Sequence, residues 1–252
     1  MSQPGGRIAL VQGASRGIGL ALVEALRARD PSGQVFASCR GQASAKLLGL
    51  ADADAGIHPV TLDVESPEGP DQAAETIART VEGLDLVINC AGILHDNAAM
   101  QPEKRLREAR PENLARSFAV NASGALLVAQ AMEPLLRRGR APLFASLSAR
   151  VGSIEDNRLG GWYGYRASKA ALNMFMRTLA IEWSRGSRPI RVVCLHPGTV
   201  ATDLSAPFAG TDGNRPIFSP AAAADQLLDV LAGLDPADSG NFYAWDGSRI
   251  PW

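Results

Sequence analysis

A tyrosine and a lysine lie four residues apart in the segment Tyr165-Arg166-Ala167-Ser168-Lys169. Residues i and i+4 of a helix share one face, so a helix through this segment turns the phenol and the ammonium toward one cleft. A phenol with a pKa of about 10 is protonated at neutral pH, and a nearby ammonium favours its phenolate. The pair is therefore a candidate to donate or accept the proton that accompanies a hydride transfer.

A glycine-rich segment, Gly13-Ala14-Ser15-Arg16-Gly17-Ile18-Gly19, joins an apolar strand-like run to an amphipathic helical pattern. Glycines in such a loop permit a tight turn and let backbone N–H groups approach a pyrophosphate at the helix N-terminus. An ordinary glycine-containing turn is the alternative, but the strand–loop–helix context favours dinucleotide binding.

The end of the second expected strand, Ser38-Cys39-Arg40, indicates which dinucleotide is bound. A carboxylate at this point would accept from the ribose 2′-hydroxyl of NAD, whereas an arginine accommodates a 2′-phosphate. The segment has no carboxylate, and Arg16 supplies a second guanidinium from the glycine loop. Two guanidinium groups near one phosphate predict NADP(H) as the cofactor, unless both are merely solvated.

Short apolar strands alternate with helical patterns along the whole chain. The expected strands are Ile8–Val11, Val35–Cys39, Ile57–Leu62, Leu84–Asn89, Leu143–Ser146, Ile190–Leu195 and Asn241–Trp245. The expected helices are Gly17–Arg29, Pro70–Glu82, Glu112–Arg137, Gly164–Arg185 and Pro220–Leu231. Continuously apolar strands between helices predict an α/β fold, in which a doubly wound, seven-stranded parallel sheet carries helices on both faces. We expect one domain spanning residues 1–252.

Two further segments have less regular patterns. The stretch Ala206–Pro220 is rich in proline and glycine and is either a lid over a substrate pocket, formed by a loop around 204–220, or a plain surface loop. The charged run Glu103–Arg110 is expected to be a solvated helical face rather than a binding site.

Composition excludes several classes of partner. A net charge of −1 gives no reason to expect nucleic acid, and no apolar run approaches the ~20 residues that span a bilayer. The N-terminus lacks a signal-peptide profile, so the cytoplasm is the expected location. Cys39, Cys90 and Cys194 lie far apart in apolar runs, which predicts reduced, buried packing residues and no metal site.

The G-x-x-x-G-x-G spacing, together with the Tyr-x-x-x-Lys motif one helix before the sixth strand, resembles the short-chain dehydrogenase/reductase family. The resemblance covers almost the whole chain and implies a Rossmann fold. It implies that Tyr165 is the catalytic acid, that Lys169 holds the nicotinamide ribose and lowers the tyrosine pKa, and that Asn121 carries a proton relay through water. An N-cap or helix-bending role is the alternative for Asn121.

Three further segments match the family's cofactor site: Asp63-Val64, for which a turn or cap role is the alternative, Asn89-Cys90-Ala91-Gly92, and Pro197-Gly198-Thr199-Val200-Ala201-Thr202. The implied cofactor-binding residues are Gly13, Ser15, Arg16, Gly17, Ile18, Gly19, Arg40, Asp63, Val64, Asn89, Ala91, Gly92, Tyr165, Lys169, Pro197, Gly198, Val200 and Thr202.

One position departs from the family pattern. The family has Ser-Ser-x-x-Gly after the fifth strand, and the second serine orients the substrate carbonyl, but registration on Gly152 puts Ala149 there. Ser148 fills the role through a local bulge, or Ser153 does, or Tyr165 polarises the carbonyl alone. We favour Ser148 as the fourth catalytic residue.

The stretch Gly152–Asn173 resembles a subgroup, the sniffer-type carbonyl reductases and the C-factor (C-signal) proteins. We therefore expect an NADPH-dependent reductase of aldehydes or ketones. A dinucleotide-binding signalling or sensor protein with little turnover is the alternative, and the missing serine favours it slightly.

The substrate itself is not specified by the sequence. We expect the pocket to be lined by residues near His95–Met100, Gly152–Trp162 and Leu204–Phe218, with aromatic residues that suggest an apolar or aromatic ligand. His95 either reaches the substrate or is a hydrogen-bonded loop histidine, which we favour. The small and apolar residues of Glu112–Arg137 and Gly164–Arg185 favour a homodimer or homotetramer, since relatives pair these helices.

Overall fold

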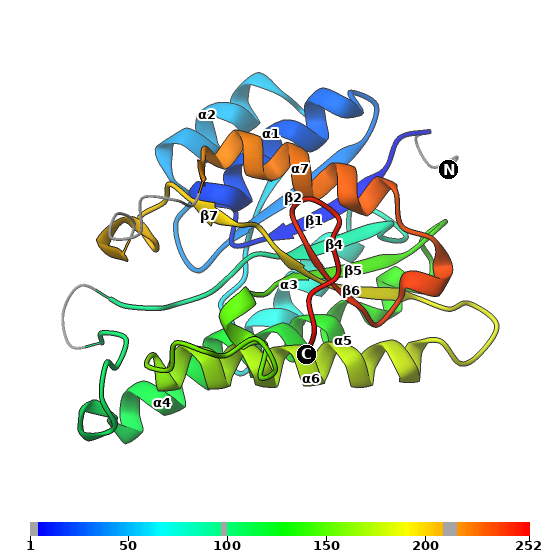
Figure 1. Ribbon diagram of the computed structural model, residues 1–252. Coiled ribbons are helices and arrows are strands. Elements are labelled where there is room, and N and C mark those ends of the chain that lie inside the picture. The colour runs from blue at the N-terminus through cyan, green and yellow to red at the C-terminus, as the bar shows by residue number, and fades with distance from the viewer. Residues whose placement is uncertain (1–4, 97–99, 209–215) are drawn as a thin grey trace.

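Seven parallel strands form one sheet in the order β3-β2-β1-β4-β5-β6-β9 (Figure 1). The computed structural model describes residues 5–96, 100–208 and 216–252. The strands of the sheet are β1 (Ile8–Gln12), β2 (Gln34–Cys39), β3 (Ile57–Thr61), β4 (Leu86–Asn89), β5 (Leu143–Leu147), β6 (Arg191–His196) and β9 (Phe242–Ala244). The central strands are buried along their full length because helices cover both faces.

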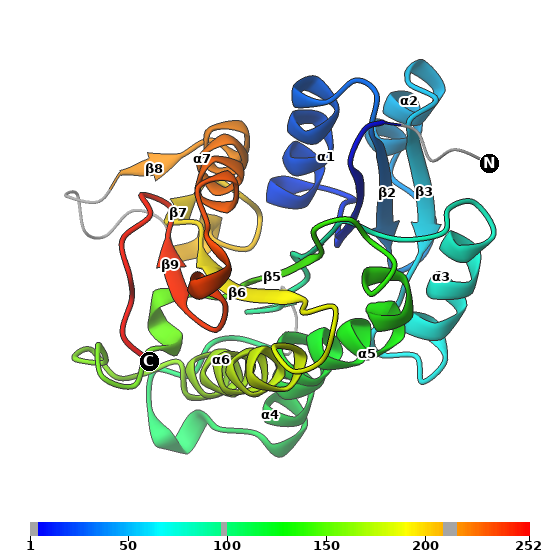
Figure 2. The same ribbon diagram turned by 90° about the vertical axis from the view of Figure 1, so that its right-hand side faces the viewer.

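Helices cover the two faces of the sheet in separate layers (Figure 2). The helices are α1 (Gly17–Arg29), α2 (Ala45–Ala53), α3 (Gly69–Ala78), α4 (Pro111–Phe118), α5 (Gly124–Leu136), α6 (Tyr163–Trp183) and α7 (Pro220–Ala232). Helices α1, α2 and α7 pack on one face, and α3, α5 and α6 pack on the other, each against its own cluster of buried apolar side chains. The predicted architecture is therefore confirmed, with strand ends within two residues of those expected.

The long helix expected over Glu112–Arg137 is interrupted. Between α4 and α5 the chain forms a π-helical turn, η2 (Ala119–Ser123). Insertions of this kind are an identifiable cause of helix kinks, and they recur at functional sites. The predicted site residue Asn121 lies inside this turn.

The expectation for Glu103–Arg110 is confirmed in its exposure but not in its helical structure, since six of these eight residues are exposed. Only η1 (Leu106–Glu108) forms a short 3-10 turn there, and the Glu103 side chain is buried rather than solvated. Helix α2, for which the sequence analysis assigned no element, begins after Ser44, whose hydroxyl accepts from the backbone N–H of Leu47.

Loops at the carboxyl end of the sheet carry the remaining elements. They include η3 (Arg150–Gly152), η4 (Ala206–Phe208) and a small parallel ribbon of β7 (Thr199–Val200) with β8 (Ile217–Phe218). Residues 209–215 of the predicted substrate loop and residues 97–99 of the predicted pocket lining lie outside the described residues.

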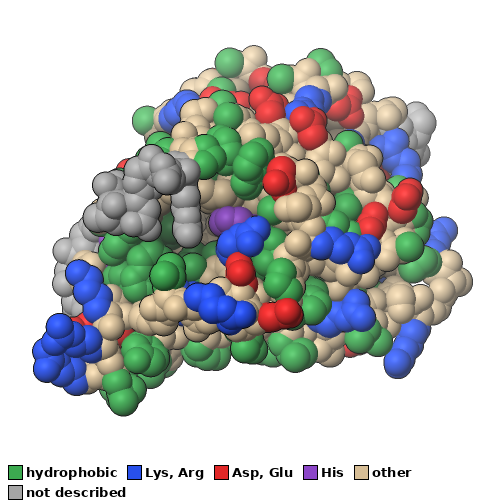
Figure 3. All heavy atoms as spheres, in the orientation of Figure 1, with side chains coloured by type: hydrophobic (Ala, Val, Ile, Leu, Met, Phe, Trp, Pro, Cys, Tyr) green, Lys and Arg blue, Asp and Glu red, His purple; other side chains and the backbone are tan. Residues whose placement is uncertain are grey.

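The two outer strands are β3 and β9. After η5 (Pro236–Asp238) and β9, the C-terminal segment turns back, and Tyr243 forms an antiparallel bridge with Arg249. Acidic and basic side chains are interspersed on the face drawn in Figure 3, with no broad area of one sign. None of the helices in the described part of the chain is long and apolar enough to cross a membrane.

Candidate active site

The glycine loop has a backbone that side chains would disrupt. Gly13 and Gly17 have φ of 83° and 56°, in the left-handed region that favours glycine. A Cβ on Gly19 would lie 2.2 Å from the Gly13 carbonyl oxygen, so α1 packs directly against the loop. The N-cap of α1, Arg16, makes no side-chain capping bond, and the first turn carries no acidic residue. This helix end is therefore suited to an anion.

Both arginines predicted to contact a 2′-phosphate are at the surface and pair with carboxylates. Arg16 Nη1 lies 2.6 Å from Asp203 Oδ2, and both side chains are more than 70% exposed. Arg40 Nη1 lies 3.5 Å from Glu65 Oε2. Exposed pairs of this kind contribute little stability, so an incoming phosphate can displace either carboxylate at small cost.

The floor of the site is a row of polar groups at the carboxyl ends of β1, β4 and β5. Asn89 Nδ2 donates to Ser146 Oγ at 3.1 Å, and the Ala91 N–H donates to Gln12 Oε1 at 3.1 Å. A Cβ on Gly92 would lie 3.4 Å from Asn121 Oδ1 and 3.5 Å from Lys169 Nζ. Asn89 thus ties two strands together, while Gly92 leaves room beside the lysine.

The remaining predicted cofactor residues surround this floor. Asp63 makes a local turn, in which its Oδ1 accepts from the Glu65 N–H at 2.9 Å, and Val64 is buried. Gly198 has φ of 76°, and Thr202 lies against the glycine loop, since a Cβ on Gly17 would be 3.3 Å from the Thr202 methyl. The structure therefore brings the glycine loop and the segment after β6 together.

Tyr165 and Lys169 share one face of α6. Lys169 is 3% exposed, and its ammonium lies 5.9 Å from the centroid of the Tyr165 ring. Lys169 Nζ donates to the Leu147 carbonyl at the end of β5, at 2.9 Å. Burial raises the pKa of Tyr165 to about 12 and lowers the pKa of Lys169 to about 8. Each group is therefore held closer to its neutral form than in water, and the direction for Tyr165 is opposite to the lowered pKa that the family resemblance implies, because desolvation dominates.

Asn121 is fully buried, and both ends of its amide are engaged. Its Oδ1 accepts from the Ile93 N–H at 2.7 Å, and its Nδ2 donates to the Ile93 carbonyl at 2.8 Å and to Ser168 Oγ at 3.0 Å. These bonds hold the π-helical turn against the loop after β4 and against α6. The helix-bending alternative therefore has direct geometric support.

The two serines predicted as substitutes for the family's catalytic serine are both hydrogen-bonded to other parts of the chain. Ser148 is buried and donates to Asn173 Oδ1 at 2.6 Å, eight residues beyond Tyr165 on α6. Ser153 Oγ donates to the Trp252 carbonyl and accepts from the Asp156 N–H. In this arrangement the hydroxyl hydrogen of Ser148 is taken up by Asn173, so the role expected of Ser148 would require that bond to be exchanged for one to the substrate carbonyl.

A row of aromatic rings, which sequence reasoning did not assemble, extends from Tyr165 toward the loop after β4. The Trp162 ring lies 6.2 Å from Tyr165 and 5.2 Å from Phe208, and Phe208 lies 5.6 Å from His95. His95 Nε2 is 3.2 Å from both the Asp203 and Leu204 carbonyls, so the favoured interpretation, a hydrogen-bonded loop histidine, agrees with the structure. The sequence signal for an unusual backbone here was the pair Gly160-Gly161 before Trp162, because all three of these residues have positive φ.

The three cysteines are free thiols; Cys39 and Cys194 are buried, as predicted, whereas Cys90 is half-buried. Cys90 and Cys194 lie near Lys169, but desolvation raises the pKa of the Cys194 thiol to about 12 and raises that of Cys90 as well. A thiol with so high a pKa is a poor nucleophile. Cys90 and Cys194 are therefore packing residues beside the site.

The fold and this site define a dinucleotide-binding α/β protein with a tyrosine–lysine pair. The sequence model of the short chain dehydrogenase family matches residues 7–212, and the chain belongs to that family. Its fold is that of an NADPH-bound carbonyl reductase from chicken fatty liver (TM-score 0.87, 32% identity, 98% of this chain and 99% of that one).

Two other proteins match the predicted subgroup. The carbonyl reductase Sniffer of D. melanogaster has a TM-score of 0.84 at 28% identity, with 98% of this chain and 99% of that one covered. C-signal of Myxococcus xanthus is 37% identical over 171 residues, 67% of this chain and 93% of that protein. Both resemblances expected from the stretch around Tyr165 are thus confirmed.

Proposed function

We propose that the protein reduces a carbonyl compound, an aldehyde or ketone, to an alcohol with NADPH. The observation that carries the proposal is the Tyr165–Lys169 pair on α6, beside a glycine loop that leaves a helix N-terminus open to a pyrophosphate. The test mixes the purified protein with NADPH, and separately with NADH, and a panel of aldehydes, ketones and quinones. Loss of absorbance at about 340 nm, the band of the reduced nicotinamide, reports oxidation of the cofactor.

The residues present fit NADP(H). Gly13 and Gly17 need left-handed backbone, Gly92 leaves space beside Lys169, and the end of β2 offers Arg40 where an NAD-binding site would have a carboxylate. The cofactor-bound carbonyl reductase of the same fold supports this choice. Bound NADPH would supply the hydride to the carbonyl carbon.

Tyr165 supplies the proton in this proposal. Its raised pKa keeps the phenol protonated and ready to donate to the carbonyl oxygen as negative charge develops there. The Lys169 ammonium faces the phenolate that results and stabilises it in a site with little water to screen the interaction. Asn121 keeps the loop after β4 and α6 in register around the pair.

We further propose that Tyr165 polarises the carbonyl without a serine. Replacing Ser148 with Ala is then expected to lower kcat/KM by less than about threefold, while the free energy of unfolding falls by about 1 kcal/mol through loss of the bond to Asn173. Ala149→Ser is expected to raise kcat/KM, since it restores the family's hydroxyl. Steady-state kinetics and denaturant unfolding of both variants measure this; a loss of about 100-fold for the Ser148 variant would reinstate Ser148 as catalytic.

The arginines give a second prediction, on cofactor choice. Arg16→Ala and Arg40→Ala should each raise KM for NADPH about tenfold and leave KM for NADH unchanged, because each removes a charge-assisted contact to the 2′-phosphate alone. Arg29→Ala is the control, since Arg29 pairs with Asp225 and Asp229 on α7. Equal effects on both cofactors would contradict the assignment.

The alternative, a dinucleotide-binding signalling protein with little turnover, has one observation in its favour, Ala149 in the place of the family's serine. Tight NADPH binding without turnover on any substrate would favour it.

We also propose a homodimer or homotetramer formed through α4, α5 and α6. Large apolar side chains stand exposed on these helices: Phe118, Leu127, Met174 and Ile181. A second copy of the chain would cover them.

A further inference from the structure

Helix α6, which carries Tyr165 and Lys169, begins without a cap of its own. Its N-cap residue is Trp162, which has φ of 53° and no side chain able to accept from the first turn. The first four N–H groups of a helix have no partner within the helix and need acceptors when they are buried. The start of the catalytic helix therefore depends on acceptors from elsewhere in the chain.

Glu103 supplies two of these acceptors. Its backbone carbonyl accepts from the Trp162 N–H, and its Oε2 accepts from the buried Gly164 N–H at 3.0 Å. Glu103 is only 5% exposed, although the residues that follow it in this charged run are exposed. A carboxylate at this position also interacts favourably with the positive end of the helix dipole, which helps offset the cost of burying its charge.

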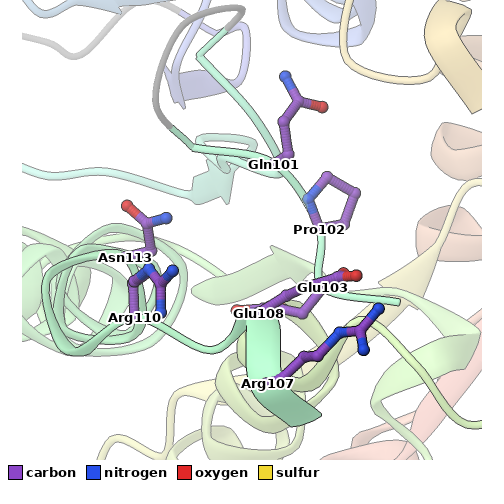
Figure 4. A pocket seen from close by; sticks show the side chains of 7 residues that line it. All are labelled: Gln101, Pro102, Glu103, Arg107, Glu108, Arg110 and Asn113. Atoms are coloured by element: carbon purple, nitrogen blue, oxygen red, sulfur yellow. The ribbon is translucent and has the colours of Figure 1, made fainter. Parts of the chain in front are cut away.

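The packing around this contact is tight. A Cβ on Gly164 would lie 3.0 Å from Glu103 Oε1 and 3.1 Å from the Leu114 side chain on α4. Glycine at 164 thus lets the carboxylate reach the helix backbone. On its outer side Glu103 helps to line a cavity of about 510 Å³ (Figure 4), between the segment after β4 and the start of α4.

The contact between Glu103 and Gly164 lies between two residues of the aromatic row, Trp162 and Tyr165. Tyr165 directly follows Gly164, and the Trp162 ring packs between Tyr165 and Phe208. The segment that carries Glu103 follows the loop of His95, at the far end of the same aromatic row. Glu103 therefore links the loop after β4 to the backbone that aims the phenol.

We infer that Glu103 is a positioning residue of the active site: it caps α6 from outside and fixes the Tyr165 phenol against the substrate. The inference rests on the proposed carbonyl reduction. A phenol displaced by about 1 Å transfers its proton much less well, and such misplacement can cost ~100-fold in rate.

The experiment compares Glu103→Ala, Glu103→Gln and Glu103→Asp with Glu108→Gln. Glu108 is the matched control, an exposed carboxylate whose Oε2 accepts from the Lys104 N–H at 2.8 Å within the same segment. We expect the Ala and Asp variants to lose at least about tenfold in kcat with KM for NADPH nearly unchanged, because proton transfer suffers and cofactor binding does not. Gln should restore most of kcat, since its amide oxygen accepts from the Gly164 N–H, and the Glu108 variant should match wild type.

Amide hydrogen exchange at Gly164, followed by NMR, gives a readout independent of turnover. The Gly164 amide should exchange faster in the Ala and Asp variants and slowly in the Gln variant. Wild-type kcat in the Asp variant, or slow Gly164 exchange in the Ala variant, would overturn the inference. Absence of turnover in wild-type protein would refute the proposed reduction alone, because the exchange measurement would still decide the role of Glu103.

Discussion

Replacing Tyr165 with Phe is expected to lower kcat/KM for the proposed carbonyl reduction by about 10³-fold, because it removes the hydroxyl that we propose as the proton donor and keeps the ring. Stopped-flow or steady-state absorbance with NADPH measures the loss. The aromatic contact with Trp162 does not involve the hydroxyl, so the wall of the pocket should survive the change.

NADPH binding is the control for this variant. The Kd for NADPH, measured by fluorescence titration, should match that of wild type within about threefold, since the glycine loop and the two arginines are untouched. Residual activity within tenfold of wild type would mean that another group, or water, donates the proton.

Replacing Lys169 with Met should lower kcat/KM by about 10²-fold and at the same time stabilise the protein without cofactor. Activity should fall because, in the proposed mechanism, the ammonium stabilises the phenolate of Tyr165. Stability rises because burial lowers the lysine pKa from 10.5 to about 8, so the charged form is disfavoured in the folded state. Met fills a similar volume without a charge to bury.

The pH dependence of the free energy of unfolding shows whether burial of the Lys169 charge destabilises the protein. Between pH 8 and 10.5 the unfolded chain holds a proton on Lys169 that the folded chain has lost, so the stability of wild type rises with pH across this window. The advantage of the Met variant should therefore be largest below pH 8, on the order of 3 kcal/mol, and fall steadily as the pH rises from 8 to 10. Tyr165 acts in the opposite direction from pH 10 to about 12, so the comparison is made below pH 10.

Thermal unfolding from pH 6 to 10 measures the difference, with Lys46→Met as the control at an exposed lysine. A Met variant that is less stable than wild type at pH 7 would show that the bond from Lys169 to the Leu147 carbonyl outweighs the cost of burying the charge. The same titration of wild-type kcat/KM should show a fall above pH 8, absent from the Met variant.

The elements that the sequence predicted well are those whose signal is local. Buried parallel strands are continuously apolar, and the glycine loop and the Tyr165–Lys169 spacing are set by backbone geometry within a few residues. Helix α2 also had a local signal, the N-cap Ser44, but its short length and small residues left the periodicity weak.

The contacts that the sequence did not predict join segments far apart in the chain. Glu103 has the composition of a solvated run, and only the approach of α6, 61 residues later, makes it a buried cap. Ser148 faces Asn173 because the carboxyl end of β5 meets α6, and no one-dimensional pattern specifies which neighbour a strand-end hydroxyl meets. The π-helical turn likewise makes a tertiary bond, between Asn121 and the distant Ile93.

The two outer strands of the sheet have a consequence for self-association. An outer strand presents unpaired N–H and carbonyl groups that can template the addition of a strand from another chain. On β3 the third of five residues is Pro59, which has no N–H to offer, and on β9 the returning C-terminal segment occupies the open side through Tyr243 and Arg249. Each edge thus has its own protection against aggregation. On β3 it is the proline ring, which is part of the covalent chain. On β9 it is the position of the C-terminal segment, and this protection is lost whenever the last few residues detach.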